Sequence, residues 1–259
     1  MAQLWTEKRV VVSTDGDTLA HDVADRLLVR LIRRSLAGKT SHIALTGGVI
    51  GTEVLRAVGA HPRRDEVDWS RVHLWWGDER FVPAGDDDRN DRAARRAFID
   101  QIDIPAENVH VMPAATGEID VDAAAAAYAA ELARYGDDDR PWPSFYLVFL
   151  GVGPDGHIAA LFPDRGEIQI TDLAVTPVRD APKPPAEQLT LTRPVINSAR
   201  CVWLVVSGGD KAAALGLALA GASYETVPAA GAKGVKRTLF FVDEAAAANV
   251  PAELIDQEY

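Results

Sequence analysis

The sequence predicts an α/β protein with a doubly wound, mostly parallel sheet flanked by helices, as in Rossmann-like folds. Apolar runs rich in β-branched residues alternate along the chain with segments of helical period. The run SFYLVFLG (144–151) is apolar without alternation, which is typical of a parallel strand buried on both faces. Because strands alternate regularly with helices, we expect βαβ units and a parallel sheet.

The first strand is expected in RVVVS (9–13). The segment after it has helical period, and its apolar side chains fall on one stripe: Val23, Leu27, Leu28, Leu31, Ile32 and Leu36. HIALTGG (42–48) is predicted to be a short buried strand that runs into two glycines. A helix from about Thr52 to Val58 completes the second strand–helix pair.

The alternation continues beyond this helix. RVHLWWGDER (71–80) is predicted to be a single strand, and DRAARRAFIDQI (91–102) a helix that Pro105 closes. VHVMP (109–113) is expected to form a short strand. The alanine-rich stretch 120–135 is predicted to be a helix, because alanine has the highest helix propensity.

GDDDRPWP (136–143) is polar enough to be a surface loop and could pass for a linker between domains. However, the central strand 144–151 follows it directly, and a linker is not expected to lead into the middle of a sheet. We therefore predict a single domain over residues 1–259.

The last third of the chain contains one irregular segment and two more strands. Residues 164–185 hold four prolines and are expected to be an extended active-site segment. RCVWLVVSGGDKAAALGLAL (200–219) is predicted to be strand, turn and helix, and RTLFFVD (237–243) a final strand. The single cysteine, Cys201, lies in one of these strands and is expected to be a buried structural thiol.

Composition and charge exclude several classes of partner. The chain is 47% hydrophobic and 25% charged, and its net charge of −11 comes from 38 acidic against 27 basic residues. Such a field repels nucleic acid and anionic membranes. A phosphorylated small molecule would need a local cluster of basic side chains and backbone N–H groups. We expect a monomer or a weak homodimer.

No targeting or membrane-spanning segment is recognisable. The N-terminal residues MAQLWTEKRVVVS lack an apolar stretch behind a basic one, and no apolar run reaches the length of a membrane helix. The expected location is the cytoplasm.

Four loops that follow predicted strands carry residues suited to binding or catalysis: TGG (46–48), GDER (77–80), GVGPDGH (151–157) and SGGDK (207–211). In doubly wound sheets the ligand lies beyond the carboxyl ends of the strands, where such loops converge. The sequence therefore predicts a site formed by all four loops.

Common cofactor and metal motifs fit these loops poorly. The pattern G-x-G-x-x-G in 151–156 would place the Asp155 carboxylate at a pyrophosphate, and Pro154 lacks an N–H donor. There is no Walker A sequence and no G-x-S-x-G turn. The six histidines show no H-x-x-x-H or H-x-H spacing. We therefore expect neither a cofactor nor a metal.

His157 is the candidate general base, because a neutral imidazole on a tight turn can activate water near neutral pH. Asp155, two residues earlier, is close enough to orient the ring or to influence its charge. The residues alone leave a purely structural histidine as an equal alternative.

An anion site is predicted from two glycine pairs and two basic side chains. Gly47 and Gly48 lead into a helix N-terminus, where free N–H groups favour an anion. Gly208 and Gly209 repeat that arrangement, with Lys211 in the next turn. Arg80 could add a forked donor, although surface salt bridges are the alternative for Arg80 and Lys211. A sugar monophosphate fits this set best.

The segments WWGDERFVP, LGVGPDGHIAALFP, APKPPAEQLTLT and VVSGGDK, in this order, resemble the 6-phosphogluconolactonase family over nearly the whole chain. The resemblance implies the sugar-phosphate isomerase/lactonase type of fold and cofactor-free hydrolysis of 6-phospho-D-glucono-1,5-lactone, the second step of the oxidative pentose phosphate pathway.

The resemblance also assigns roles to individual residues. It makes His157 the general base that activates water, with Asp155 and Asp78 shaping its environment. The substrate-binding residues that it implies are Gly47, Gly48, Arg80, Asn90, Lys183 and Lys211.

Three positions depart from the family pattern. Many members have S-G-G-S-T-P where this chain has TGGVIG (46–51), so the phosphate must depend more on backbone donors. The usual Ser-Asn is Arg89-Asn90, and A-S-L-F-P-G has become AALFPD (159–164). None of these changes affects Asp155 or His157.

Two alternatives stay open. Glucosamine-6-phosphate deaminase, of the same superfamily, also carries G-x-G-x-D-G-H-I-A, but continues toward F-N-E-P where this chain reads ALFP (160–163). It also tends to have tyrosine at the position of Arg80. A catalytically inactive sugar-phosphate-binding regulator is the other alternative, because a fold does not guarantee an activity.

Overall fold

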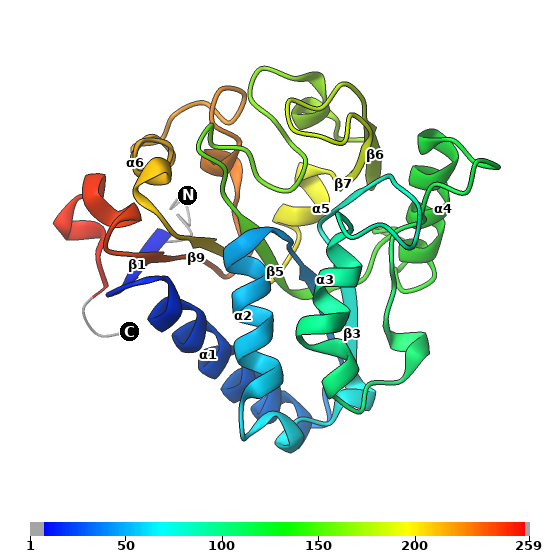
Figure 1. The fold of residues 1–259 in the computed structure, drawn as a ribbon, viewed down its shortest axis with the longest axis horizontal. Coiled ribbons are helices and arrows are strands. Elements are labelled where there is room, and N and C mark those ends of the chain that lie inside the picture. The colour runs from blue at the N-terminus through cyan, green and yellow to red at the C-terminus, as the bar shows by residue number, and fades with distance from the viewer. Residues whose placement is uncertain (1–7, 257–259) are drawn as a thin grey trace.

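The computed structural model describes residues 8–256, and a six-stranded sheet forms its centre (Figure 1). The strand order is β1-β9-β8-β5-β2-β3, and every neighbouring pair is parallel. The strands of this sheet are β1 (Lys8–Ser13), β2 (Ser41–Leu45), β3 (Val72–Trp76), β5 (Phe145–Gly151), β8 (Cys201–Val206) and β9 (Arg237–Asp243). The predicted fold class, a parallel sheet flanked by helices, is confirmed.

The helices lie between these strands in the sequence. Their bounds are α1 (Gly16–Leu36), α2 (Gly48–Ala60), α3 (Asn90–Ala97), α4 (Val121–Ala133), α5 (Arg193–Asn197) and α6 (Ala212–Leu219). The helices α1, α2 and α3 pack side by side (Figure 1). Short 3-10 helices occupy several connections, among them Ile99–Gln101, Gly166–Gln169 and Gly209–Lys211.

Helix α1 shows how the sequence sets a boundary and a buried face. Asp15 caps its start by accepting a hydrogen bond from the Thr18 backbone N–H at 2.8 Å. The predicted stripe from Val23 to Ile32 is buried. Leu36 is an exception, because the helix ends there and leaves its side chain 84% exposed.

The order in which the chain visits the sheet locates the binding edge. The chain fills one half through β2 and β3, returns to the centre at β5, and then continues outward through β8 and β9. The strands β2 and β5 are hydrogen-bonded neighbours, so the connections after them diverge from adjacent strand ends. In doubly wound sheets this switch point is where a crevice opens.

The prediction of one strand over 71–80 is wrong. Strand β3 stops at Trp76, and β4 (Asp78–Arg80) joins a separate antiparallel sheet of order β4-β7-β6 with β6 (Val175–Val178) and β7 (Gln188–Leu191). Gly77 connects the two sheets: its N–H donates to the Leu45 carbonyl at 2.9 Å, and its carbonyl accepts from the Leu191 N–H at 2.8 Å. Asp78 and Arg80 therefore lie in the second sheet, beyond the carboxyl end of β3.

Other boundaries also differ from the predictions. Helix α2 begins at Gly48 rather than near Thr52, and α3 ends at Ala97, after which a 3-10 turn replaces the expected helix to residue 102. The segment 109–113 forms only a single bridge between Val109 and Leu74, not a strand. The segment 164–185, expected to be an extended active-site segment, contains the extended strand β6 but also a 3-10 turn, Gly166–Gln169.

Two further expectations concern the ends of the chain and Cys201. The Cys201 side chain is buried, as predicted, and burial raises the pKa of its thiol. The expectation of no secretory signal falls partly on residues 1–7, outside the described residues. Within residues 8–256, no helix combines the length and apolar character needed to cross a membrane.

Candidate active site

A cavity of about 640 Å³ lies where the four glycine-containing loops meet. It contains residues that follow β2, β5 and β8, together with two residues of β4. The predicted site residues that line it are Gly47, Gly48, Asp78, Arg80, His157, Lys183 and Lys211. The other two, Asp155 and Asn90, contact lining residues instead. The structure therefore brings all nine together around one cavity.

Asp155 and His157 form a hydrogen-bonded pair on the turn after β5. The Nδ1 atom of His157 lies 2.5 Å from Oδ1 of Asp155, and the same carboxylate oxygen accepts from the His157 backbone N–H at 3.3 Å. The Gly156 N–H donates to the Gly153 carbonyl at 2.9 Å and closes the turn. His157 is therefore held at both its backbone and its ring.

Glycine at position 153 makes room for this pair. A Cβ atom there would overlap the His157 ring and would lie 2.5 Å from Oδ1 of Asp155. Burial acts to raise the pKa of Asp155, but the hydrogen bond and charge of His157 outweigh it and lower this pKa to about 2. The carboxylate therefore stays ionised, and as an acceptor it favours the tautomer that carries hydrogen on Nδ1.

Asp78 is the second carboxylate at the cavity, and its side chain is almost fully buried. Burial raises the pKa of Asp78, while the charges of Arg80 and His157 and a hydrogen bond from Asn90 act in the opposite direction. The pKa of Asp78 therefore depends on groups of the site itself, and its charge is coupled to theirs.

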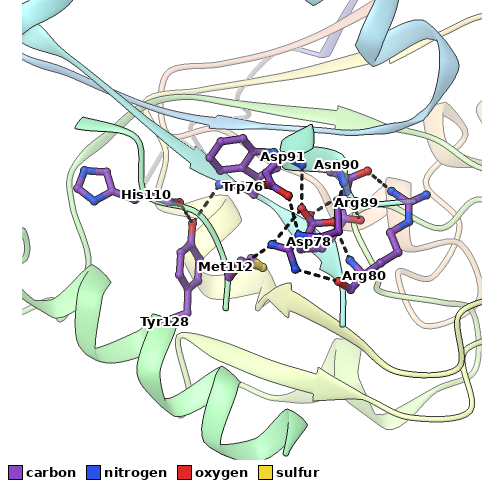
Figure 2. Close-up of polar contacts among 10 residues, drawn as sticks. Trp76, Asp78, Arg80, Arg89, Asn90, Asp91, His110, Met112 and Tyr128 are labelled. Atoms are coloured by element: carbon purple, nitrogen blue, oxygen red, sulfur yellow. Dashed lines mark hydrogen bonds and ion pairs between the residues drawn. The ribbon is translucent and has the colours of Figure 1, made fainter. Parts of the chain in front are cut away.

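Asn90 joins Asp78 to Arg80 (Figure 2). Its Oδ1 accepts a hydrogen bond from the Arg80 guanidinium, and its Nδ2 donates to the Asp78 carbonyl at 2.9 Å and the Asp78 carboxylate at 3.3 Å. The TGG loop packs directly on this side chain, since a Cβ atom at Gly47 would overlap the Asn90 amide. The start of α2 therefore lies directly against the Asn90 side chain, which in turn contacts Asp78 and Arg80 of β4.

The start of α2 has the features of an anion site. Gly47 is its N-cap and offers no side-chain acceptor, and the first turn contains no acidic residue. The backbone N–H groups of a first helical turn have no partners within the helix and favour negative charge. Val49, where the family pattern has a hydroxyl residue, is 84% exposed at the cavity. Backbone donors are therefore what α2 contributes there.

The expectation that Gly208 and Gly209 lead into a helix N-terminus holds only in part, because a 3-10 turn, Gly209–Lys211, precedes α6. The Gly208 N–H donates to the Asp243 carboxylate at 3.0 Å, and α6 begins only at Ala212, after a 3-10 turn. Lys211 does line the cavity, but its Nζ lies 2.8 Å from Oδ1 of Asp210. In this loop, the lysine is paired with Asp210 and the Gly208 N–H is already used by Asp243.

Sequence reasoning missed several acidic residues of the cavity and a buried carboxylate behind it. Asp17, Glu53 and Asp210 also line the cavity. Glu53 lies in the first turns of the helix after the TGG loop, a signal that could have identified it. Glu79, the third residue of GDER, is fully buried beside the cavity residues. Among the described residues, no group of three or more His, Cys, Asp or Glu side chains is arranged to hold a metal ion.

Comparisons with known proteins show the family of this chain. The profile of the family described as glucosamine-6-phosphate isomerases/6-phosphogluconolactonase matches residues 14–241. A 6-phosphogluconolactonase of Streptomyces coelicolor is 43% identical over 95% of this chain and 96% of its own length. One of Mycobacterium leprae is 45% identical over 96% of this chain and 98% of its own length.

Solved structures extend the likeness to the fold. The structure of 6-phosphogluconolactonase from Trypanosoma brucei is 24% identical, covers 95% of this chain and 100% of its own, and has a TM-score of 0.80. At that identity the comparison supports the fold alone, whereas the family follows from the profile and the bacterial relatives. The chain therefore belongs to the family of glucosamine-6-phosphate isomerases and 6-phosphogluconolactonases.

Proposed function

We propose that this protein hydrolyses 6-phospho-D-glucono-1,5-lactone to 6-phospho-D-gluconate in the oxidative pentose phosphate pathway, with His157 as general base. One observation carries the proposal: the Asp155–His157 pair lies at the same cavity as Arg80, Lys183, Lys211 and the start of α2. A base and an anion site share one cavity large enough for a sugar phosphate.

The chemistry needs little more than these groups. Asp155 accepts a hydrogen bond from the Nδ1–H group of His157. The lone pair on Nε2 is then left to take a proton from water. The water oxygen bonds to C1 of the lactone, and the tetrahedral intermediate collapses by breaking the bond between C1 and the ring oxygen. The proton on Nε2 then passes to that oxygen, which becomes the C5 hydroxyl. A lactone is an activated ester, so no acyl-enzyme is required.

Substrate binding is assigned to the remaining residues. Arg80 provides a forked donor for the 6-phosphate, and Lys183, Lys211 and the N–H groups at Gly47 and Gly48 add to it. The net charge of −11 makes this local cluster necessary, because the protein's overall field repels a phosphate. The small phosphorylated substrate is thus held by local contacts rather than long-range attraction.

The deaminase alternative lacks its expected acid. Ala160, Leu161 and Phe162 follow the histidine turn, and all three side chains are buried and apolar. This segment offers no glutamate to the cavity at the positions where the deaminase pattern continues toward F-N-E-P. We therefore favour lactone hydrolysis over deamination.

A substrate panel tests the proposal. We expect 6-phosphogluconolactone, made in situ, to disappear much faster than in an enzyme-free blank, unphosphorylated gluconolactone to be a poor substrate, and glucosamine 6-phosphate to release no ammonia. Ammonia release without lactone hydrolysis would favour the deaminase, and binding without either reaction would favour a regulator. We further propose that the protein is a single domain and is located in the cytoplasm. We also propose that it is a monomer or a weak homodimer, and sedimentation at several protein concentrations tests this oligomeric state.

A further inference from the structure

Strand β4 presents its residues alternately to the cavity and to the interior. Asp78 and Arg80 line the cavity, whereas Glu79, between them, points away from it and is fully buried. This alternation follows from the pleat of a β-strand. A buried carboxylate is costly unless its charge and its acceptor sites are matched by partners. The partners of Glu79 therefore reveal what this residue does.

The Glu79 carboxylate accepts three backbone hydrogen bonds. Its Oε1 accepts from the N–H groups of Arg80 at 2.8 Å and Asn90 at 2.7 Å, and its Oε2 accepts from the Asp91 N–H at 2.8 Å. The N–H groups of Asn90 and Asp91 belong to the first turn of α3, where no helical partner exists and negative charge is favourable. One carboxylate thus ties β4 to the beginning of α3.

Arg89 supplies the matching charge from the residue just before α3. Its side chain is 2% exposed, and its Nη2 lies 3.7 Å from Oε2 of Glu79. The guanidinium also donates from Nε to the Asp91 carboxylate at 2.6 Å and from Nη2 to the Met112 carbonyl at 2.7 Å (Figure 2). Burial raises the pKa of Glu79, and Arg89 is the strongest influence in the opposite direction. The net pKa of Glu79 is raised to about 7, and Arg89 together with the three N–H groups acts to favour the ionised carboxylate.

This buried pair contacts the backbone of two residues of the site, Arg80 in the cavity wall and Asn90 beside it. Glu79 holds the backbone of both Arg80 and Asn90, and the Asn90 amide in turn contacts the Arg80 guanidinium and the Asp78 carboxylate. The Nη1 of Arg89 also approaches the Arg80 carbonyl at 3.4 Å. The position of the Asn90 amide relative to the Arg80 guanidinium therefore depends on how α3 sits against β4.

We propose that Glu79 and Arg89 are positioning residues that hold Arg80 and Asn90 in the orientation that binds the sugar phosphate. The inference rests on the proposed function for the identity of the ligand. Neither side chain lines the cavity, so both act through Arg80 and Asn90.

The test compares Arg89→Met with a matched control, Arg165→Met. Arg165 also combines a carboxylate partner, Glu167, with backbone carbonyl acceptors, but it does not line the cavity. We expect Arg89→Met to raise KM for the lactone and Kd for 6-phosphogluconate by about tenfold, the scale of one charge-assisted hydrogen bond, with kcat changed less than about threefold. Arg165→Met is expected to leave all three unchanged.

A mutant cycle separates positioning from general destabilisation. If Arg89 acts through Arg80, the Arg80→Ala/Arg89→Met double variant should have a KM within about twofold of Arg80→Ala alone. The proposal would be overturned if the two single-variant effects on KM multiplied in the double variant. It would also be overturned if Arg89→Met had a lowered Tm with KM and Kd unchanged. Should Arg89→Met fail to fold, Arg89→Lys keeps the charge without the fork and is expected to raise KM in the same direction, and an unchanged KM would overturn it.

The two proposals fail in distinguishable ways. A wild-type protein that binds 6-phosphogluconate in calorimetry but hydrolyses no lactone would remove the proposed function. The Kd values of the Arg89 variants would still decide the positioning role, because they require no turnover.

Discussion

The Nδ1 atom of His157 lies 2.5 Å from Oδ1 of Asp155, and both side chains come from a single turn at the carboxyl end of the central strand β5. The carboxylate fixes the hydrogen on Nδ1, so the lone pair on Nε2 is left for water. This arrangement supports the proposed role of His157 as the general base, and it leads to the first two predictions.

Asp155→Asn should lower kcat by on the order of a hundredfold or more, because an amide can donate to Nδ1 and favour the wrong imidazole tautomer. KM should change little, since Asp155 does not line the cavity. Steady-state kinetics of Asp155→Asn checks this. The control variant is Asp164→Asn, which changes an acidic residue further along the same loop. Equal kcat values in Asp155→Asn and wild type would show that Asp155 does not orient the base.

Gly153→Ala should impair catalysis without directly changing a catalytic residue. The added Cβ overlaps the His157 ring, so the ring or the turn must move, and a displaced base costs roughly a hundredfold in kcat. Gly166→Ala is the matched control, because nothing lies within 4 Å of a Cβ there. Turnover by Gly153→Ala at the wild-type rate would mean that the ring position is unimportant.

Arg80→Ala should raise KM by about ten- to a hundredfold with a smaller effect on kcat, because the forked contact to the phosphate is made in both the ground and transition states. Arg71→Ala serves as the comparison, since Arg71 pairs with Asp68 on an exposed surface. Initial rates over a range of lactone concentrations give both parameters. A KM that matches wild type would exclude Arg80 from phosphate binding.

Stability should fall as the pH drops below about 6.5 because of a histidine cluster away from the cavity. His42 stacks on His73, whose Nδ1 lies 3.0 Å from Nε2 of His110, and Glu131 contacts the other side of His110 at 2.8 Å. The Trp75 indole N–H donates to Nδ1 of His42 at 3.2 Å. A proton added to that nitrogen would therefore face another donor.

Burial, followed by the charges of His73, His110 and Arg34, lowers the pKa of His42 to about 3. The unfolded chain then binds this proton first, so the stabilising contribution is complete above pH 6.5 and is lost as the pH falls toward 3. For His42 alone the loss is about 2 kcal/mol at pH 5.

Urea unfolding at pH 8 and pH 5 measures this loss, and His42→Gln should show a smaller difference because its amide oxygen can accept from Trp75. Identical pH dependence in both proteins would rule out His42 as its source.

The main strands and helices could be predicted from the sequence because their signals are local. The side chains of β5 are buried on both faces, and those of the apolar stripe of α1 are buried on one face. Each pattern can be read from a short stretch of sequence. The second sheet could not be predicted, since its strands pair β4 with β7, more than a hundred residues away. Residue 77 looked like a continuation of the strand. Only the hydrogen bonds that the Gly77 N–H donates to Leu45 and that its carbonyl accepts from Leu191 show why the chain changes sheets there.

The same distinction applies to the site. Loops after parallel strands must meet at one edge, so the grouping of His157 with Gly47 and Lys211 followed from topology. The role of Arg89 could not be inferred, because a charged residue beside an aspartate ordinarily indicates a surface. Its burial depends on Glu79 and the Met112 carbonyl, which only the folded chain brings to it.

The most direct test of the account is the rate of 6-phosphogluconolactone disappearance at neutral pH in wild type, His157→Ala and an enzyme-free blank. The account predicts that wild type greatly exceeds the blank and that His157→Ala loses at least about a hundredfold in kcat with KM nearly unchanged. A His157→Ala variant that turns over the lactone at the wild-type rate would contradict the assignment of His157 as the base.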